Sequence, residues 1–437
     1  MIVFSRFRMS AWGGIIVSLA ILANPGGAFA AASWSPGVVI VASQPSSAPS
    51  TFAVNPTGTE LWVTVPPVTG GAVVEAAQRS LGDVWSPFAT ITSIHTVGLA
   101  LVQSLSASIS ATNNAAAGWV FGGGVEIALR SPVGAWQAPV AFATTGGASS
   151  LQVKVDAQGN GVAAWSQLTA TASVVDAVAW TSGGTFGNVA QLSPPTRGAF
   201  QPDIAVNEAG TAVVVWQAAA PLDNSNPNQI ESATRPAGGT WSAMAPVSPA
   251  MPLTGSARVA LDGSGGATVV YEQGSSYGIY AATRPAGGAW GSPTEIEPSN
   301  PYFAGQASVA TDAAGKVTAT WAAETGGATY IRVATRSAGS SWGAPSSLGQ
   351  CSSMTCVPHL AAARDGSIVV VGWAPAGGTS NNAAVRLGAG SWAPMTVGTG
   401  SAQLTYLVAT GNARASAVWP VATRVKYHNA LGQSDYQ

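Results

Sequence analysis

Charged residues are scarce in this chain of 437 residues. Asp, Glu, Lys and Arg together make up 8% of it, against roughly 25% in an ordinary soluble domain. The formal net charge is −1 and only three residues are Lys, so no basic cluster exists to bind a nucleic-acid backbone. The chain is nevertheless not of disordered composition, because 47% of its residues are hydrophobic and 16 are Trp. The sequence therefore predicts a folded protein that does not bind nucleic acid.

Cysteine and histidine are almost absent, with two and three residues respectively. Cys351 and Cys356 lack both the C-x-x-C spacing of a redox pair and further metal ligands, so we expect a disulfide in an oxidising compartment. His95, His359 and His428 are isolated from one another, and no G-x-S-x-G nucleophile motif occurs. His359 is interpreted as a solvated loop residue. The sequence thus predicts no metal, no cofactor and no catalytic residues.

No apolar run is long enough to cross a bilayer, which takes about 20 residues. The longest run extends from Ala11 to Ala23, after Arg6 and Arg8, and ends at the helix-breaking segment 24–27. The small-x-small pattern of residues 28–30 then follows. These features are typical of a secretory signal peptide. We expect residues 1–30 to be removed near Ala30 and residues 31–437 to be secreted, either to the periplasm or out of the cell.

Aromatic residues recur in two registers along the chain. In the first, the aromatic residue ends an apolar run such as 213–216; in the second, it follows a glycine-rich turn, and successive members are 49 to 55 residues apart. The first register comprises Trp62, Trp119, Trp165, Trp216, Tyr271, Trp321, Trp373 and Trp419, and the second comprises Trp34, Trp85, Trp136, Phe186, Trp241, Trp290, Trp342 and Trp392. A period near 50 residues indicates a repeat architecture.

Each repeat contains four short segments with the composition of β-strands. Around Trp216 they span residues 202–206, 212–216, 230–235 and 241–247. The first two are joined by Asp or Asn followed three residues later by Gly, as in Asp156…Gly159 and Asn207…Gly210. This pattern predicts a hairpin turn, and one carboxylate per turn is too few for calcium. Four antiparallel strands per repeat are typical of a β-propeller blade.

The two ends of the mature chain are predicted to share one blade. Trp34-Ser35-Pro36 is similar to the start of a fourth strand, as at Trp392. Residues 407–419 supply a first and a second strand, and residues 424–429 supply a third. An open solenoid would end in capping repeats instead. We therefore predict an all-β protein with one closed propeller of eight blades, sealed by pairing of its N- and C-terminal strands. Seven blades is the alternative if Trp119 or Phe186 marks a degenerate repeat.

The turn before the second aromatic register resembles the Asp-box of bacterial sialidases and related propellers, S-x-D-x-G-x-T-W. Residues 234–241 read T-R-P-A-G-G-T-W, and similar segments occupy 283–290 and 335–342. Gly238, Thr240 and Trp241 match the family positions, whereas Pro236 and its equivalents Pro285 and Ser337 replace the Asp. The resemblance extends over nearly all of the mature chain as repeats. It implies the propeller fold, and it transfers no activity because the Asp-box is a structural turn away from the catalytic face.

The connections of such a blade fall on two faces. The first–second and third–fourth turns are uniform, whereas the second–third and fourth–first loops on the other face are irregular, so we expect ligand contacts on the irregular face. Aromatic stacking and side-chain hydrogen bonds there would suit a sugar, with solvated loop polarity as the alternative for each residue. The candidate ligand-binding residues are Gln167, Gln217, Glu272, Gln273, Tyr277, Tyr302 and Glu324.

Sialidase chemistry would require three clustered Arg, a Tyr–Glu pair and an acidic Asp. Tyr271-Glu272 has the composition of such a pair, but Tyr271 belongs to the first, core register. Six arginines recur at one register on the turn face and are interpreted as structural: Arg79, Arg130, Arg235, Arg284, Arg336 and Arg386. The sequence favours a secreted, monomeric, non-enzymatic propeller that binds a glycan or a cell-envelope protein. The alternative is a divergent glycoside hydrolase of sialidase type.

Overall fold

A computed structural model of the chain describes residues 12–20, 33–34, 38–44, 49–68, 71–80, 85–95, 102–219, 228–251, 254–274, 278–297, 304–351, 356–374, 380–399, 406–410 and 414–422. The regular secondary structure of these ranges consists of β-strands. No helix within them has the length and apolar character needed to cross a membrane.

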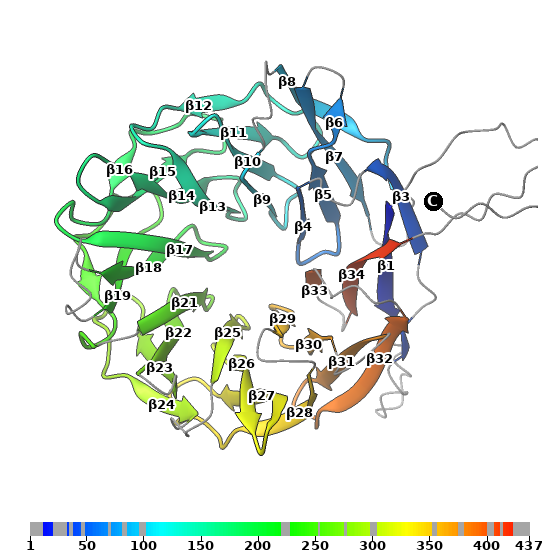
Figure 1. The fold of residues 1–437 in the computed structure, drawn as a ribbon, viewed down its shortest axis with the longest axis vertical. Coiled ribbons are helices and arrows are strands. Elements are labelled where there is room, and N and C mark those ends of the chain that lie inside the picture. Colours follow the sequence, from blue (N-terminus) through cyan, green and yellow to red (C-terminus); the bar gives the residue numbers. More distant parts are fainter. Residues whose placement is uncertain are drawn as a thin grey trace, which may run out of the picture.

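Seven sheets repeat one pattern, in which antiparallel strands follow one another in chain order. Six of them have four strands each, beginning at β9, β13, β17, β21, β25 and β29. In the seventh, β4, β5, β7 and β8 have the same order, and the two-residue strand β6 also pairs with β7. Figure 1 shows the sheets arranged around a central opening, with the first strand of each sheet innermost. These seven sheets confirm the prediction of four-stranded propeller blades.

The strands of the seven sheets have these bounds: β4 (Ser50–Val54), β5 (Glu60–Thr64), β6 (Pro67–Val68), β7 (Gly71–Arg79), β8 (Ala89–His95); β9 (Ser104–Ile109), β10 (Ala115–Phe121), β11 (Gly124–Arg130), β12 (Val140–Phe142); β13 (Ala148–Val155), β14 (Gly161–Leu168), β15 (Ser173–Trp180), β16 (Ala190–Gln191); β17 (Gly198–Val206), β18 (Ala212–Ala219), β19 (Gln229–Arg235), β20 (Ala245–Pro246); β21 (Thr254–Leu261), β22 (Ala267–Gln273), β23 (Gly278–Arg284), β24 (Thr294–Glu297); β25 (Ala304–Thr311), β26 (Val317–Thr325), β27 (Ala328–Arg336), β28 (Ser346–Gln350); β29 (His359–Ala362), β30 (Ile368–Trp373), β31 (Ser380–Leu387) and β32 (Ala393–Thr399).

A further sheet combines strands from both ends of the chain. It contains β33 (Tyr406–Thr410), β34 (Arg414–Ala422), β1 (Trp12–Ala20), β2 (Ser33–Trp34) and β3 (Val38–Gln44). β34 pairs with β33 on one edge and with β1 on the other, and β2 and β3 pair with the far edge of β1. Figure 1 places this sheet between those of β29–β32 and β4–β8.

The third strand of this sheet differs from the sequence prediction. We expected residues 424–429 in that position, and they lie outside the described residues. β1 occupies it instead. Its apolar sequence, rich in β-branched residues, has a composition that suits a strand paired along both of its edges.

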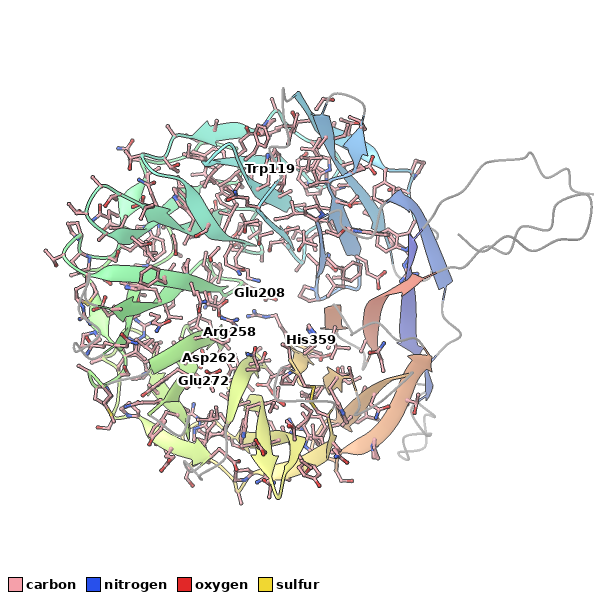
Figure 2. The ribbon with its side chains drawn as sticks, viewed as in Figure 1. Trp119, Glu208, Arg258, Asp262, Glu272 and His359 are labelled. Atoms are coloured by element: carbon pink, nitrogen blue, oxygen red, sulfur yellow. A yellow bond between two sulfur atoms is a disulfide. The ribbon has the colours of Figure 1, made fainter. Side chains whose placement is uncertain are left out.

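The core lies between adjacent sheets rather than at the centre of the molecule. Val120 and Val125 of one sheet, for example, pack in one cluster with Trp165 and Val178 of the next. Trp119, which Figure 2 labels, is fully buried, as are the other first-register residues Trp165, Trp216, Tyr271 and Trp321. The members of the second register whose side chains the structure describes are only half-buried, as is Trp62 of the first register. The first register is therefore the core register, as predicted.

Uniform hairpin turns join the first and second strands, as expected. Asp156 Oδ1 accepts hydrogen bonds from the backbone N–H groups of Gln158 and Asn160, at 2.9 and 2.8 Å. Gly159 has a φ of 92°, in the left-handed region that favours glycine. The turns also bind one another across sheets: Thr112 Oγ1 donates to the carbonyl of Ala157 at 2.6 Å. This face is a hydrogen-bonded scaffold.

The recurring arginines hold the turns between the third and fourth strands. In five repeats the guanidinium lies over the Trp ring six residues later, 5.0 to 5.8 Å from its centroid. Arg284 also donates from Nη1 to Thr234 Oγ1 of the preceding sheet, at 2.6 Å. These contacts support the structural interpretation for five of the six arginines, all except Arg235.

The fourth strands are shorter than predicted at several sheets. The segment expected to span 241–247 pairs only at Ala245–Pro246. Proline has no N–H to donate to a ladder, which restricts it to sheet edges. Trp241 packs against the core cluster that contains Trp216 and Ile204 instead of extending the strand.

Candidate functional site

A cavity of about 250 Å³ lies in the central opening, at one end of the inner strands. It is lined by residues at or near the beginning of β21, β25 and β29 and by Glu272, near the end of β22. This end of the inner strands is where the second–third and fourth–first loops emerge. The cavity therefore opens on the face whose loops are irregular in sequence.

Glu272 is the one carboxylate among the described residues that line this cavity. Its Oε1 accepts a hydrogen bond of 2.7 Å from the backbone N–H of Gln306 in the next sheet. Burial raises the pKa of the Glu272 carboxyl, while the N–H groups of Gln306 and Ala307 and the charge of Arg258 act in the opposite direction. A Cβ at position 255 would lie 2.6 Å from Glu272 Oε2, so this carboxylate position requires glycine there.

Arg258 departs from the repeat pattern of the inner strands. At the same repeat position, Ser106 Oγ accepts the N–H of Val153 at 3.1 Å, and Asp203 Oδ2 accepts the N–H of Val259 at 2.9 Å. These bonds give a partner to a backbone N–H group on the free edge of the first strand in the next sheet. A guanidinium has no acceptor and cannot make such a bond. Arg258 is instead exposed at the cavity, where Nη1 donates to the Ala257 carbonyl at 3.1 Å.

His359 in β29 occupies the same repeat position as Arg258 in β21. His359 pairs with Gly372, the residue before the core Trp373, just as Arg258 pairs with Val270, the residue before the core Tyr271. It lines the cavity together with Arg258 and Glu272. Figure 2 shows all three labelled side chains around the lower half of the central opening. The cavity thus combines a cation, an imidazole and a carboxylate contributed by different sheets.

Backbone strain is concentrated at this end of the inner strands. Each of β13, β17 and β25 carries a bulge, at which Ser150, Gln201 and Gln306 have φ values of 54°, 52° and 58°. Left-handed non-glycine residues cost on the order of 1–3 kcal/mol and cluster at functional sites. Gln201 Oε1 also accepts from Ser256 Oγ of the next sheet at 2.8 Å. Of these bulge residues, Gln306 lines the cavity and Gln201 contacts the lining residue Ser256.

The residues predicted from sequence are only partly brought together. Glu272 lies in the cavity, whereas Gln167, Gln217 and Glu324 lie near the ends of the second strands of three other sheets. Gln167 Nε2 donates to Thr145 Oγ1 at 3.2 Å. Gln273 is 3% exposed and contacts the sulfur of Met251. Tyr277 and Tyr302 lie outside the described residues.

Arg258, Gln306 and His359 were missed as site residues. An alignment of the sequence repeats on their core aromatic residues could have identified two of them. That alignment places Arg258 and His359 at a position occupied elsewhere by acceptors such as Ser106 and Asp203. From the sequence, Arg258 was assigned no role and His359 was interpreted as a solvated loop residue.

A disulfide joins Cys351 and Cys356, whose Cα atoms are 6.3 Å apart. Both residues are buried beside Trp373 and Ile331. The chain reaches His359 three residues after Cys356. The disulfide therefore lies directly before the cavity-lining residues 357–360 in the chain.

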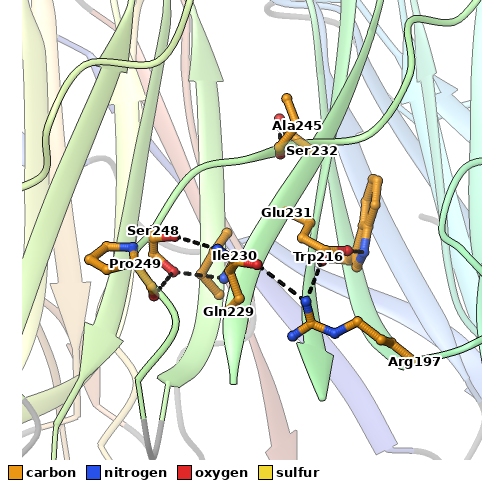
Figure 3. Close-up of polar contacts among 9 residues, drawn as sticks. All are labelled: Arg197, Trp216, Gln229, Ile230, Glu231, Ser232, Ala245, Ser248 and Pro249. Carbon is orange, nitrogen blue, oxygen red and sulfur yellow. Dashed lines mark hydrogen bonds and ion pairs between the residues drawn. The ribbon is translucent and has the colours of Figure 1, made fainter. Parts of the chain in front are cut away.

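A second acidic residue, Glu231, is fully buried and does not line the cavity. Figure 3 shows its carboxylate between Trp216 Nε1, which donates to Oε2 at 3.0 Å, and Arg197 Nη1, 3.0 Å from Oε1. Arg197 also donates to Gln229 Oε1 at 3.2 Å. Burial raises the pKa of the Glu231 carboxyl, and Arg197 and Trp216 oppose this. Since its partners are supplied by the chain, this carboxylate is assigned a structural role.

The opposite end of the inner strands borders a second cavity, of about 220 Å³, lined by Lys154, Asp156, Glu208 and Arg364 among others. It lies against the uniform turns. Within the described ranges, no group of three or more His, Cys, Asp and Glu side chains could hold a metal ion.

No protein-family model matches the sequence, and no characterised protein sequence matches it. Solved structures with a similar shape include the α-L-arabinofuranosidase of Fusarium graminearum (14% identity, 68% of this chain and 93% of that chain, TM-score 0.38). Others are the neuraminidase-like protein of A/flat-faced bat/Peru (12%, 68% and 84%, 0.36) and the six-bladed fungal lectin of Aleuria aurantia (16%, 68% and 95%, 0.35). Similarities of this size assign no role to any residue.

Proposed function

We propose that this chain is secreted after cleavage near Ala30 and that residues 31–437 form a closed propeller of eight blades that binds a glycan without hydrolysing it. Ring closure is supported by one sheet between the first and last of the seven blades, which contains β33 and β34 from the C-terminal end and β2 and β3 from the start of the segment 31–437. In this sheet β1, from residues 1–30, lies between β34 and the strands β2 and β3. The observation that carries the binding function is the central cavity with Arg258, Glu272 and His359 in its wall.

The size and chemistry of the cavity favour a small polar ligand. Its 250 Å³ lie below the roughly 300–1,000 Å³ of sites for drug-sized molecules, so one sugar unit rather than a protein surface would fill it. The guanidinium of Arg258 is a donor, the carboxylate of Glu272 is an acceptor, and the imidazole of His359 can serve as either. Hydroxyl groups of a sugar can bond to all three.

A glycan array with the secreted protein tests this function. Arg258→Ala should abolish binding of any glycan that the wild-type protein retains, and it should not impair folding because the side chain is exposed. Lys154→Ala is the matched control, since it removes a cation from the wall of the opposite cavity. Equal binding by the wild-type protein and the Arg258 variant would overturn the assignment of the site. Binding of a cell-envelope protein, with no glycan bound, would favour the protein-binding function instead.

A divergent glycoside hydrolase is the second candidate, favoured by the raised pKa of the Glu272 carboxyl, which suits a general acid. Glycoside hydrolysis generally uses a pair of carboxyl groups within about 10 Å of each other, whereas the cavity wall contributes one. Tyr271 is fully buried in the core rather than beside the cavity. Release of the fluorophore from a fluorogenic sialoside, lost in Glu272→Gln, would establish the enzyme instead.

A further inference from the structure

One aromatic side chain of the described residues is displayed to solvent. Phe200, in β17, is 41% exposed, whereas every other aromatic side chain that the structure describes is buried or half-buried. A single apolar side chain on a surface assigns no role by itself. The position of Phe200 does, because the next residue, Gln201, contacts Ser256 in the wall of the central cavity.

Phe200 lies on the side of its sheet that faces this wall. The preceding residue, Ala199, packs in one cluster with Val175 of the sheet β13–β16. Successive side chains of a strand point to opposite faces, so Phe200 belongs to the other face, toward β21. β21 supplies Ser256 and Arg258 to the cavity. Phe200 is also near the beginning of β17, at the end of the strand where the irregular loops emerge.

The ring of Phe200 rests on the backbone of Gly198, two residues earlier. A Cβ at position 198 would lie 2.7 Å from Cε2 of the ring and 2.9 Å from Cζ, so any other residue there would displace the ring. One part of the ring is thus packed against the chain, while the rest stays in contact with solvent. A side chain fixed in this way loses little conformational entropy when a ligand stacks on it.

Amide side chains flank the ring. Gln217 in β18 pairs with Phe200 across the ladder, and the exposed Gln201 follows it in the chain. An amide offers hydrogen-bond donors and an acceptor. An apolar ring beside amides suits a sugar unit, which has C–H groups on its faces and hydroxyl groups around its edge.

We propose that Phe200 is a stacking platform for the second sugar unit of a glycan whose end unit occupies the central cavity. Gln201 and Ser256 link the two positions. The proposal rests on the proposed function of the cavity and names the ligand class, an oligosaccharide of at least two units. A single sugar would fill the cavity and leave Phe200 without a contact.

Isothermal titration calorimetry tests the platform. The probes are the di- and trisaccharides that the wild-type protein retains on the glycan array and the methyl glycosides of their end sugars. Phe200→Ala should weaken binding of the di- and trisaccharides by about ten-fold and leave the affinity for the methyl glycosides unchanged. Phe200→Tyr keeps the ring and should bind every probe as the wild-type protein does. Val140→Ala is the matched control, since Val140 is 40% exposed but belongs to the outer strand β12.

The variants separate the platform from the cavity. Loss of all binding in Arg258→Ala, with di- and trisaccharide binding unchanged in Phe200→Ala, would overturn the platform and keep the proposed function. An equal loss of methyl glycosides and oligosaccharides in Phe200→Ala would also overturn the platform, because the ring would then act on the cavity itself. Absence of any glycan binding by the wild-type protein would overturn both proposals.

Discussion

Arg364 and Glu208 form an ion pair, with 3.1 Å between Nε and Oε1, although they belong to sheets that are not neighbours. Glu208 lies in the turn between β17 and β18, and Arg364 lies in the turn between β29 and β30. Figure 2 shows Glu208 beside the central opening. The pair lies in the wall of the second cavity and narrows the end of the opening opposite the candidate site. A ligand for that site would therefore enter from the irregular face.

Glu208→Ala should change the free energy of unfolding by less than about 1 kcal/mol, because the Glu208 side chain is 50% exposed and exposed ion pairs contribute little. Urea denaturation at low salt measures the change, with Glu208→Gln as the isosteric control. A loss of several kcal/mol would show instead that the pair holds distant sheets together.

Asp176 should make stability fall as the pH rises from about 4 to about 6. Burial raises the pKa of its carboxyl from 3.8 to about 6. Below pH 4 the group is protonated in both the folded and unfolded states, and above pH 6 it is ionised in both. Between these values only the unfolded state loses its proton, which favours unfolding by up to about 3 kcal/mol. Asp176→Asn should remove this part of the pH dependence in denaturation curves; an unchanged curve would contradict the raised pKa.

Asp176→Glu should supply a missing hydrogen bond. Asp176 pairs with Trp165 across β15 and β14, as Glu126 and Glu231 pair with Trp119 and Trp216 in their sheets. Both Glu side chains accept from the indole N–H, at 3.1 and 3.0 Å, whereas the Nε1 of Trp165 is buried without a partner.

The extra methylene of Glu should reach that N–H and stabilise the fold by about 1 kcal/mol. Slower exchange of the indole proton in NMR spectra would show the new bond. Lower stability with unchanged indole exchange would show that the site has no room for the longer side chain.

Glu231→Ala should destabilise the fold by about 3 kcal/mol or more, because it leaves the indole of Trp216 and the cation of Arg197 without their buried partner. Glu231→Gln should cost less, since an amide oxygen can still accept from the indole. Chemical denaturation of both variants ranks the two effects. Equal losses would indicate that charge, not the hydrogen bond, dominates at this site.

The sequence predicted the repeat well because its signals are local. The Asp156…Gly159 turn depends on side-chain and backbone groups within four residues, and the Arg284–Trp290 contact joins residues six apart. The fourth strands were less predictable, because proline and a packed Trp compete there with edge pairing. Of the predicted ligand-binding residues that the structure describes, Glu272 alone lines the cavity.

The sequence by itself determined the strands, the turns and the buried aromatic register, since each depends on neighbours within one repeat. Only the tertiary structure decided which residues meet at the centre. Arg258, Glu272 and His359 come from β21, β22 and β29, and the distance between those strands depends on how successive sheets pack around the axis. The same packing brings Trp12 beside Ala422, from opposite ends of the chain. Local patterns specify blades, whereas the angle between blades specifies the site.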